Sequence, residues 1–125
     1  MADLDELLNS FTRVRGVNTA LVVGQDGLVL HSVAAPGVEE AESDVDVLGA
    51  MASSGLIPAQ EIGSESNRGR LLQGIYEYEG GVIVIEPIGE SAILVVVSTA
   101  AANLGLLRLQ ARKIHPQLEE ALSGL

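Results

Sequence analysis

Cysteine is absent from this sequence of 125 residues. Its absence excludes disulfides, thiolate nucleophiles, cysteine-ligated zinc and iron–sulfur clusters. Aromatic side chains are also rare, because Phe11, Tyr76 and Tyr78 are the only ones. They are too few to form a platform on which nucleic-acid bases stack.

Basic residues are scarce as well. Seven Lys and Arg residues compare with seventeen Asp and Glu residues, so the formal net charge is −10 at pH 7. That balance opposes binding to nucleic-acid phosphates and to anionic membranes. The longest uninterrupted apolar run, Ala92 to Val97, is far shorter than the roughly 20 residues of a membrane-spanning helix. The opening, with Asp3 and Asp5, is unlike a secretory signal, so we expect a cytoplasmic protein without nucleic-acid or membrane partners.

Motifs for common catalytic and nucleotide-binding sites are missing. The only lysine is Lys113, and neither a phosphate-binding loop of the Gly-x-x-x-x-Gly-Lys-Ser/Thr type nor a Gly-x-Ser-x-Gly elbow occurs. His31 and His115 are the only histidines, and neither has a second histidine at ligand spacing. We therefore expect no enzyme activity, no cofactor and no metal. His31 is expected to be structural, and His115 to lie at the surface or its boundary.

Three sets of charged residues allow a functional interpretation. The acidic stretch could bind a hard cation but lacks the spacing of a calcium loop, and glutamates on a hairpin could form a carboxylate pair. Exposed arginines could act on a nucleotide held by another protein, as an arginine finger does. In each case we expect solvated or interface charges instead: Glu39, Glu40, Glu42, Asp44 and Asp46 in the acidic stretch, Glu77, Glu79 and Glu86 on the hairpin, and Arg13, Arg15, Arg68 and Arg70.

Hydrophobic periodicity predicts three helices and five strands. Apolar residues at i, i+3, i+4 and i+7 from Leu4 to Phe11 indicate the first helix. Asp26-Gly27 between two apolar runs indicates a hairpin, and the doubly apolar run Ala92 to Val97 indicates a central strand. The expected helices span about residues 3–14, 44–63 and 99–122, and the expected strands span residues 17–23, 28–33, 70–78, 82–88 and 92–97.

Two local expectations concern helix and strand geometry. Pro58 cannot donate a hydrogen bond to the carbonyl four residues earlier, which predicts a kink or a break in the middle helix. A two-residue Gly80-Gly81 turn would place Tyr78 opposite Ile83 in the next hairpin. The order helix, two strands, helix, three strands, helix indicates a single α+β domain over residues 1–125.

Four stretches of the sequence, in this order of elements, carry a family resemblance. They are Leu4 to Val17 with its helical stripe, Val22-Val23-Gly24-Gln25-Asp26-Gly27-Leu28-Val29-Leu30, Gly81 to Val96, and Ala102-Asn103-Leu104-Gly105-Leu106-Leu107-Arg108-Leu109. Together they resemble the roadblock / dynein-light-chain family and, within it, the MglB-like regulators of small GTPases. The resemblance covers the chain from about Leu4 to Leu122.

The resemblance implies both a fold and a function. The implied fold is a five-stranded antiparallel sheet in the order 2-1-5-4-3, with the first and last helices on one face and the middle helix on the other. The family forms homodimers or heterodimers that bind Ras-like GTPases as scaffolds or GTPase-activating proteins, or that serve as motor light chains. The resemblance to MglB-like members implies a dimer that acts on one GTPase and reorganises that GTPase's own catalytic residues without donating an arginine.

A homodimer is also expected from the strand over residues 70–78. This strand should lie at the sheet edge, and it contains neither the proline nor the lysine that would block pairing with another chain. The middle helices should then pack beside the paired edges. The expected dimer contacts are Leu71, Gln73 and Ile75 on the strand and Leu48, Met51 and Ala52 on the middle helix.

The GTPase is expected on the side of the middle helix, because one short helix covers its sheet face less completely than two helices do. Small side chains there permit close approach, and acidic ones could steer a basic partner surface. The expected contact residues are Asp46, Ala50, Ser53 and Ser54. Two alternatives remain open, a purely structural dimerisation or scaffold subunit and a small-molecule sensor domain.

Overall fold

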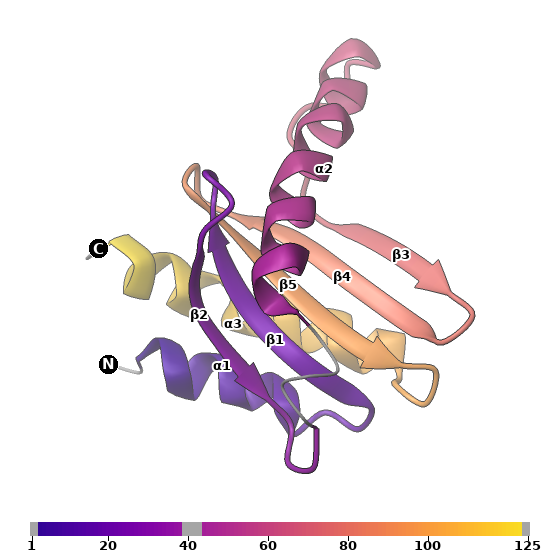
Figure 1. The fold of residues 1–125 in the computed structure, drawn as a ribbon. Coiled ribbons are helices and arrows are strands. Elements are labelled where there is room, and N and C mark those ends of the chain that lie inside the picture. Colours follow the sequence, from indigo (N-terminus) through magenta and orange to yellow (C-terminus); the bar gives the residue numbers. More distant parts are fainter. Residues whose placement is uncertain (1–2, 39–43, 124–125) are drawn as a thin grey trace.

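The computed structural model describes residues 3–38 and 44–123 (Figure 1). Its elements are α1 (Leu4–Thr12), β1 (Val17–Gly24), β2 (Val29–Ala34), α2 (Val45–Glu65), β3 (Gly74–Tyr78), β4 (Gly81–Ile88), β5 (Ala92–Thr99) and α3 (Leu104–Ser123). The strands form one sheet in the order β2-β1-β5-β4-β3, and all neighbouring pairs are antiparallel. The predicted α+β class and strand order are confirmed.

α1 and α3 lie side by side on one face of the sheet and close the larger apolar core (Figure 1). Asp3 caps α1, since its carboxylate accepts a hydrogen bond from the N–H of Glu6 at 2.9 Å. The predicted stripe points inward, and Leu8 and Phe11 are fully buried. The matching buried stripe of α3 is Leu107, Ala111, Ile114 and Leu118.

β1 and β5 form the centre of the sheet and are buried on both faces. Along β5, Leu94 and Val96 belong to the core beneath α1 and α3, whereas Ile93 and Val95 belong to the core beneath α2. This alternation explains why every residue of the run from Ala92 to Val97 is apolar. The predicted central position of this strand is confirmed.

α2 alone covers the other face of the sheet (Figure 1). Asp44 caps it by accepting a hydrogen bond from the N–H of Val47 at 3.2 Å. Gly49 allows a close approach to the sheet, because a Cβ there would lie 3.0 Å from the side chain of Val29. The buried residues of α2 are Gly49, Ala52 and Leu56, so only the first half of the helix packs on the strands.

The second half of α2 extends beyond the sheet and contains Pro58 (Figure 1). The helix is continuous from Val45 to Glu65, so the predicted break at Pro58 does not occur. Pro58 leaves the carbonyl of Ser54 without a helical donor, and both residues are exposed. Because water can hydrate that carbonyl, the helix continues past the proline.

β3 begins at Gly74 rather than at Arg70, so the predicted strand was too long. Gly74 lies opposite Ile85 of β4. The same register would place Leu72 opposite Pro87, which has no backbone N–H to donate to the ladder. Pairing therefore stops at Gly74, and residues 70–73 form an irregular connection from α2.

The β3–β4 hairpin register also differs from the expectation. Tyr78 lies opposite Gly81 rather than Ile83, so the two-residue loop is Glu79-Gly80. Gly81 has a φ of +152° and lies so close to the carbonyl of Ser98 that no side chain fits there. Because the register shift is an even number of residues, each side chain stays on its predicted face.

α3 begins at Leu104, later than the start predicted near residue 99. Asn103 occupies the capping position, and its side-chain oxygen accepts a hydrogen bond from the N–H of Leu106 at 3.1 Å. Thr99 instead belongs to β5. Pro116 lies within α3, and the helix continues through it.

Candidate functional site

An apolar surface remains uncovered on the α2 side of the sheet. α2 packs mainly over β1, β2 and β5, whereas Ile83 and Ile85 of β4 lie only at the margin of the core beneath it and most of β3 lies to one side of the helix (Figure 1). Tyr76 and Tyr78 point to this side, are 43% and 57% exposed, and have ring centroids 6.4 Å apart. We call this surface, together with the outward side of α2, the platform: Val47, Met51, Ile62, Tyr76, Tyr78 and Ile83.

The platform ends at an open sheet edge. β3 pairs with β4 on one side, and within the described residues no strand pairs with its other side. An edge strand of this kind presents unpaired N–H and C=O groups that another chain can use. The predicted edge position of this strand is confirmed.

On α2, the predicted dimer contacts lie apart from the predicted GTPase contacts. Met51 is 67% exposed and Leu48 is half-buried, and both lie on the flank of the helix away from Ser53. Ala52 is only 7% exposed and packs against the sheet of its own chain. Ala52 is therefore a core residue and not an interface residue, which corrects the expectation.

The predicted GTPase contacts lie near the β1–β2 turn. The hydroxyl of Ser53 donates to the backbone carbonyl of Gln25 at 2.7 Å, so Ser53 holds α2 on that turn. Asp46, Ala50 and Ser54 are exposed. These three side chains remain free to meet a partner, whereas Ser53 is half-buried and already bonded.

The predicted dimer contacts before and on β3 divide between the two sheet faces. Leu71 is half-buried and packs on the core beneath α2. Gln73 and Ile75 line a cleft on the opposite face. Only Ile75 belongs to the edge strand itself, because Leu71 and Gln73 precede β3.

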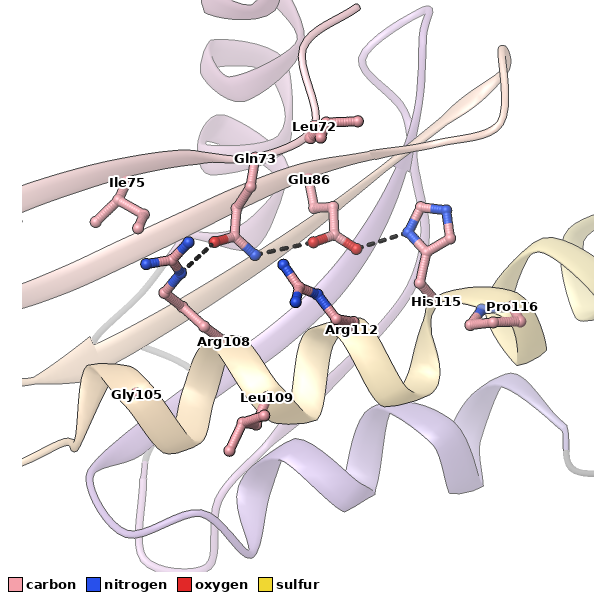
Figure 2. Close-up of a pocket in the computed structure, with 10 residues that line it drawn as sticks. All are labelled: Leu72, Gln73, Ile75, Glu86, Gly105, Arg108, Leu109, Arg112, His115 and Pro116. Carbon is pink, nitrogen blue, oxygen red and sulfur yellow. Dashed lines mark hydrogen bonds and ion pairs between the residues drawn. The ribbon is translucent and has the colours of Figure 1, made fainter.

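That cleft has a volume of about 690 Å³ and lies between α3 and the segment that leads into β3 (Figure 2). Arg108 and Arg112 extend into it from successive turns of α3. Leu72 and Ile75 lie on the facing wall, and the buried Glu86 of β4 lies between the two walls. We call it the α3 cleft.

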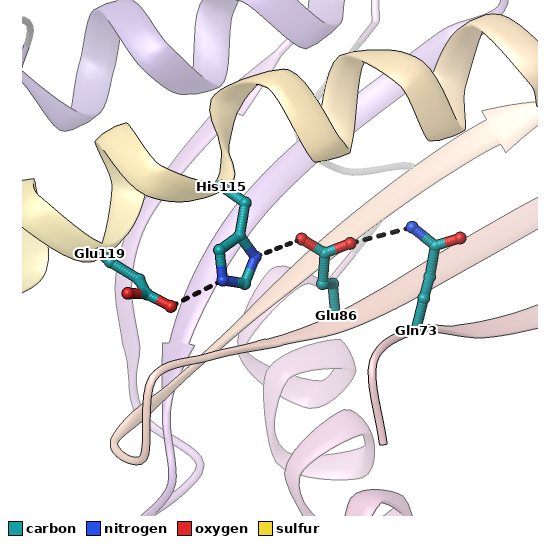
Figure 3. Close-up of polar contacts among 4 residues, drawn as sticks. All are labelled: Gln73, Glu86, His115 and Glu119. Atoms are coloured by element: carbon teal, nitrogen blue, oxygen red, sulfur yellow. Dashed lines mark hydrogen bonds and ion pairs between the residues drawn. The ribbon is translucent and has the colours of Figure 1, made fainter. Parts of the chain in front are cut away.

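A chain of hydrogen bonds crosses the α3 cleft (Figures 2 and 3). Arg108 Nε donates to Gln73 Oε1 at 3.1 Å, and Gln73 Nε2 donates to Glu86 Oε1 at 2.9 Å. The other oxygen of Glu86 lies 2.7 Å from His115 Nδ1, and His115 Nε2 lies 2.7 Å from Glu119 Oε1. These contacts tie α3 to β4 and to the segment before β3.

The charge of His115 depends on its two carboxylate neighbours. Burial by itself lowers the pKa of His115, because it disfavours the charged ring. The hydrogen bonds and negative charges of Glu86 and Glu119 outweigh that effect and raise the pKa of His115 above its ordinary value of 6.5. Both ring nitrogens lie beside a carboxylate oxygen, and only the protonated ring can donate to both.

Glu86, like Ala52, lies elsewhere than predicted. The prediction put it at a solvent-facing or interface edge, yet it is 5% exposed. A signal was available, because Glu86 alternates with Val84 and Ile88, which point into the core beneath α3. Its partner His115 is half-buried at the boundary, in agreement with the expectation, but no sequence pattern links the two residues.

The remaining charged candidates have structural or solvated positions. His31 lies opposite Val22, and its Nε2 lies 3.0 Å from Asp5 Oδ1, which links β2 to α1. Glu39, Glu40 and Glu42 lie outside the described residues, whereas Asp44 caps α2. The candidates with exposed side chains are Asp46, Glu77, Glu79, Arg13, Arg15, Arg68 and Arg70.

The described parts of the chain hold neither a metal-ligand cluster nor a membrane-spanning helix. Within residues 3–38 and 44–123, no group of three or more His, Cys, Asp or Glu side chains is arranged to hold a metal ion. The helices of these same segments are all too short or too polar to cross a membrane.

Known proteins share this fold. The Roadblock/LC7 domain model matches residues 3–98. Uncharacterized protein MJ0714 of Methanocaldococcus jannaschii is 38% identical over 116 residues, which cover 93% of this chain and 93% of that protein. Gliding protein MglB from Thermus thermophilus superposes with a TM-score of 0.89 at 21% identity, covering 97% of this chain and 89% of that one. An MglB structure with a tetrameric arrangement superposes with a TM-score of 0.88 at 24% identity and the same coverage of the two chains, 97% and 89%.

The family match extends over α1, α2 and all of the sheet except Thr99, the last residue of β5. The strand order and the division of the helices between the two sheet faces are those that the sequence resemblance implied. This chain belongs to the Roadblock/LC7 domain family.

Proposed function

We propose that this chain is a cytoplasmic, non-enzymatic homodimer that regulates or scaffolds a Ras-like small GTPase. The observation that carries the proposal is the platform, in which an unpaired edge strand adjoins an apolar sheet face that a single chain leaves uncovered. Membership of the Roadblock/LC7 domain family supports this assignment, as does the fold shared with MglB.

The dimer forms through β3. Pairing two copies of β3 satisfies the open backbone groups of both edges and joins the two sheets. The uncovered face with Tyr76 and Tyr78 then lies near the partner's α2, and Met51 extends from the flank of α2 that is turned away from the β1–β2 turn. The tetrameric arrangement of an MglB structure is in keeping with self-association in this fold.

The GTPase binds the outward side of α2 near the β1–β2 turn. Ala50 and Ser54 are small and exposed, so the backbone of a partner can approach closely, and the exposed Asp46 favours a basic partner surface. None of these contact residues is an arginine. Any acceleration of GTP hydrolysis therefore acts through the catalytic residues of the GTPase, without an arginine finger.

The test is capture of purified Ras-like small GTPases, loaded with GDP or a non-hydrolysable GTP analogue, on the immobilised chain. Ser54→Arg should reduce capture about tenfold or more, because a long charged side chain would occupy the contact. Light scattering should show an unchanged dimer, since Ser54 is exposed and is not among the expected dimer contacts. Ser123→Arg is the matched control on α3 and should capture normally.

Three results would contradict parts of the proposal. A folded dimer that captures no small GTPase in either nucleotide state favours the purely structural scaffold. Normal capture by Ser54→Arg with loss in Arg108→Gln would move the contact to the opposite face. A stoichiometric calorimetric isotherm for zinc, calcium, ATP or GTP with the chain alone would contradict the expected absence of metal and nucleotide ligands.

A further inference from the structure

Two arginines line the α3 cleft, on the sheet face opposite the platform. The chain has only seven Lys and Arg residues in a molecule of net charge −10. Two of these seven, Arg108 and Arg112, line this one cleft from the same side of α3. His115 continues the row one turn further and carries positive charge when protonated.

The two arginines are available to a ligand in different ways. The Nε bond of Arg108 to Gln73 orients its guanidinium group, while no described residue accepts a hydrogen bond from its two terminal nitrogens. Arg112 makes no hydrogen bond or ion pair with any described residue, and both guanidinium groups extend from α3 towards the sheet (Figure 2). Both oxygens of Glu86 already have partners, so the carboxylate at the base of the cleft is satisfied from within.

The facing wall of the cleft is apolar. Leu72 is 73% exposed and Ile75 is 37% exposed, and both lie across the cleft from the two arginines (Figure 2). Large apolar side chains with this much exposed surface, beside cations that form no ion pair, are typical of a surface that a partner protein buries. The α3 cleft therefore has one cationic wall and one apolar wall.

We propose that the α3 cleft binds an extended, acidic segment of a partner protein in which acidic and apolar residues alternate. Arg108 and Arg112 are one helical turn apart, a rise of about 6 Å. Alternate side chains of an extended chain are about 6.6 Å apart and point to the same side. Carboxylates at alternate positions thus meet the two arginines, while the intervening apolar side chains meet Leu72 and Ile75.

Other anions fit the α3 cleft less well. A small carboxylate or phosphate would pair with the guanidinium groups but leave Leu72 and Ile75 exposed. A nucleic acid would meet the net charge of −10 and would find no aromatic side chain in the cleft, because Tyr76 and Tyr78 lie on the other sheet face. A bound acidic segment would leave the platform free, so the chain could hold two different proteins on its two faces.

The experiment titrates the full chain into a fluorescein-labelled peptide of eight residues with alternating glutamate and leucine and follows fluorescence anisotropy. Saturable binding is expected, and Arg112→Gln should weaken it about tenfold, as expected for the loss of one charge-assisted pair. Lys113→Gln removes the same charge from the adjacent residue, which does not line the cleft, and should bind like the wild type. Ser54→Arg on the platform should also bind normally.

Several outcomes would overturn the assignment. Equal weakening by Arg112→Gln and Lys113→Gln would show general attraction to α3 instead of a site. Equal binding of a peptide with glutamine in place of glutamate would show that the carboxylates are not recognised. Equal binding of a peptide with its glutamates and leucines in two separate blocks would show that their alternation is not recognised. Competition by free glutarate at the same concentration as the peptide would identify a small dicarboxylate as the occupant. Failure of this test leaves GTPase capture on the platform unaffected, so the two proposals are separable.

Discussion

His115 lies at the boundary of the core, and both of its ring nitrogens contact carboxylates. It joins the buried Glu86 of β4 to Glu119 of its own helix, and Arg108 reaches the same chain of contacts through Gln73. The raised pKa of His115 means that the folded chain holds this proton more tightly than the unfolded chain does. The stabilisation is therefore complete below pH 6.5 and is lost as the pH rises through the raised folded-state pKa.

His115→Gln should consequently remove a pH-dependent part of the stability. At pH 6 we expect the variant to unfold more easily by about 1–3 kcal/mol, because Glu86 loses a charged hydrogen-bond partner. The difference from the wild type should shrink as the pH rises above 6.5. Urea unfolding at a series of pH values measures this difference in the free energy of unfolding. His31→Gln keeps the His115 contacts, so its unfolding should retain the same pH-dependent loss, and a constant difference between His115→Gln and the wild type would refute the linkage.

Gly81 has no room for a side chain, whereas its neighbour Gly80 has. Gly81 has a φ of +152° and meets the carbonyl of Ser98 on β5, whereas a Cβ at Gly80 would meet nothing within 4 Å. Gly81→Ala should destabilise the fold by about 2 kcal/mol or more, because a backbone of the central sheet must shift. Gly80→Ala should stay within about 0.5 kcal/mol of the wild type. Thermal unfolding measures the two melting temperatures, and equal values for the two variants would contradict this account.

α2 is an element with an anchored first half and an extended second half. Its buried residues all precede Pro58, so the turns after the proline depend on helical hydrogen bonds more than on packing. Pro58→Ala restores the missing donor to the carbonyl of Ser54. A proline in a helix interior costs about 3 kcal/mol relative to alanine, so the second half should become more stable locally.

Hydrogen exchange of the amides in residues 59–65 measures that change. Exchange there should slow about tenfold or more in Pro58→Ala, while the amides of the central strands change little. Ala59→Gly is the matched change in the opposite direction and should speed exchange, because glycine weakens a helix by about 1 kcal/mol. Unchanged exchange in Pro58→Ala would mean that contacts outside the helix hold this segment.

At the scale of the whole molecule, the open edge of β3 is the feature on which the proposed dimer depends. The hairpin pairs Tyr78 with Gly81, so alternate residues of β3, including Glu77, direct their N–H groups away from β4. Glu77→Pro removes one outward N–H and leaves the pairing with β4 in place, as proline does on natural edge strands. Light scattering should give twice 13.0 kDa for the wild type and 13.0 kDa for Glu77→Pro.

Glu77→Gln separates the backbone effect from the charge. It keeps the N–H and removes the carboxylate, so the dimer should persist. A wild-type mass of 13.0 kDa at tens of micromolar would contradict dimerisation altogether. An unchanged dimer mass in Glu77→Pro would place the interface elsewhere, for example on α2 alone.

The sequence by itself determined the elements, their order and their inward faces. Local rules suffice for this, because the stripe on α1, the Asp26-Gly27 turn and the doubly apolar β5 depend on residues only a few positions apart. The wrong predictions concern positions that depend on residues distant in the sequence. Pro87 of β4 ended the pairing of β3, and the sheet face beneath α3 buried Glu86.

Only the tertiary structure determined which exposed residues share a surface. Gln73 of the segment before β3, Glu86 of β4 and His115 of α3 meet because α3 packs beside the β3–β4 edge. Likewise, Tyr76 becomes part of an uncovered face because α2 packs over β1, β2 and β5 and leaves β3 bare. Hydrophobic periodicity fixes which way a side chain points within its element, but sites between elements depend on packing that brings distant segments together.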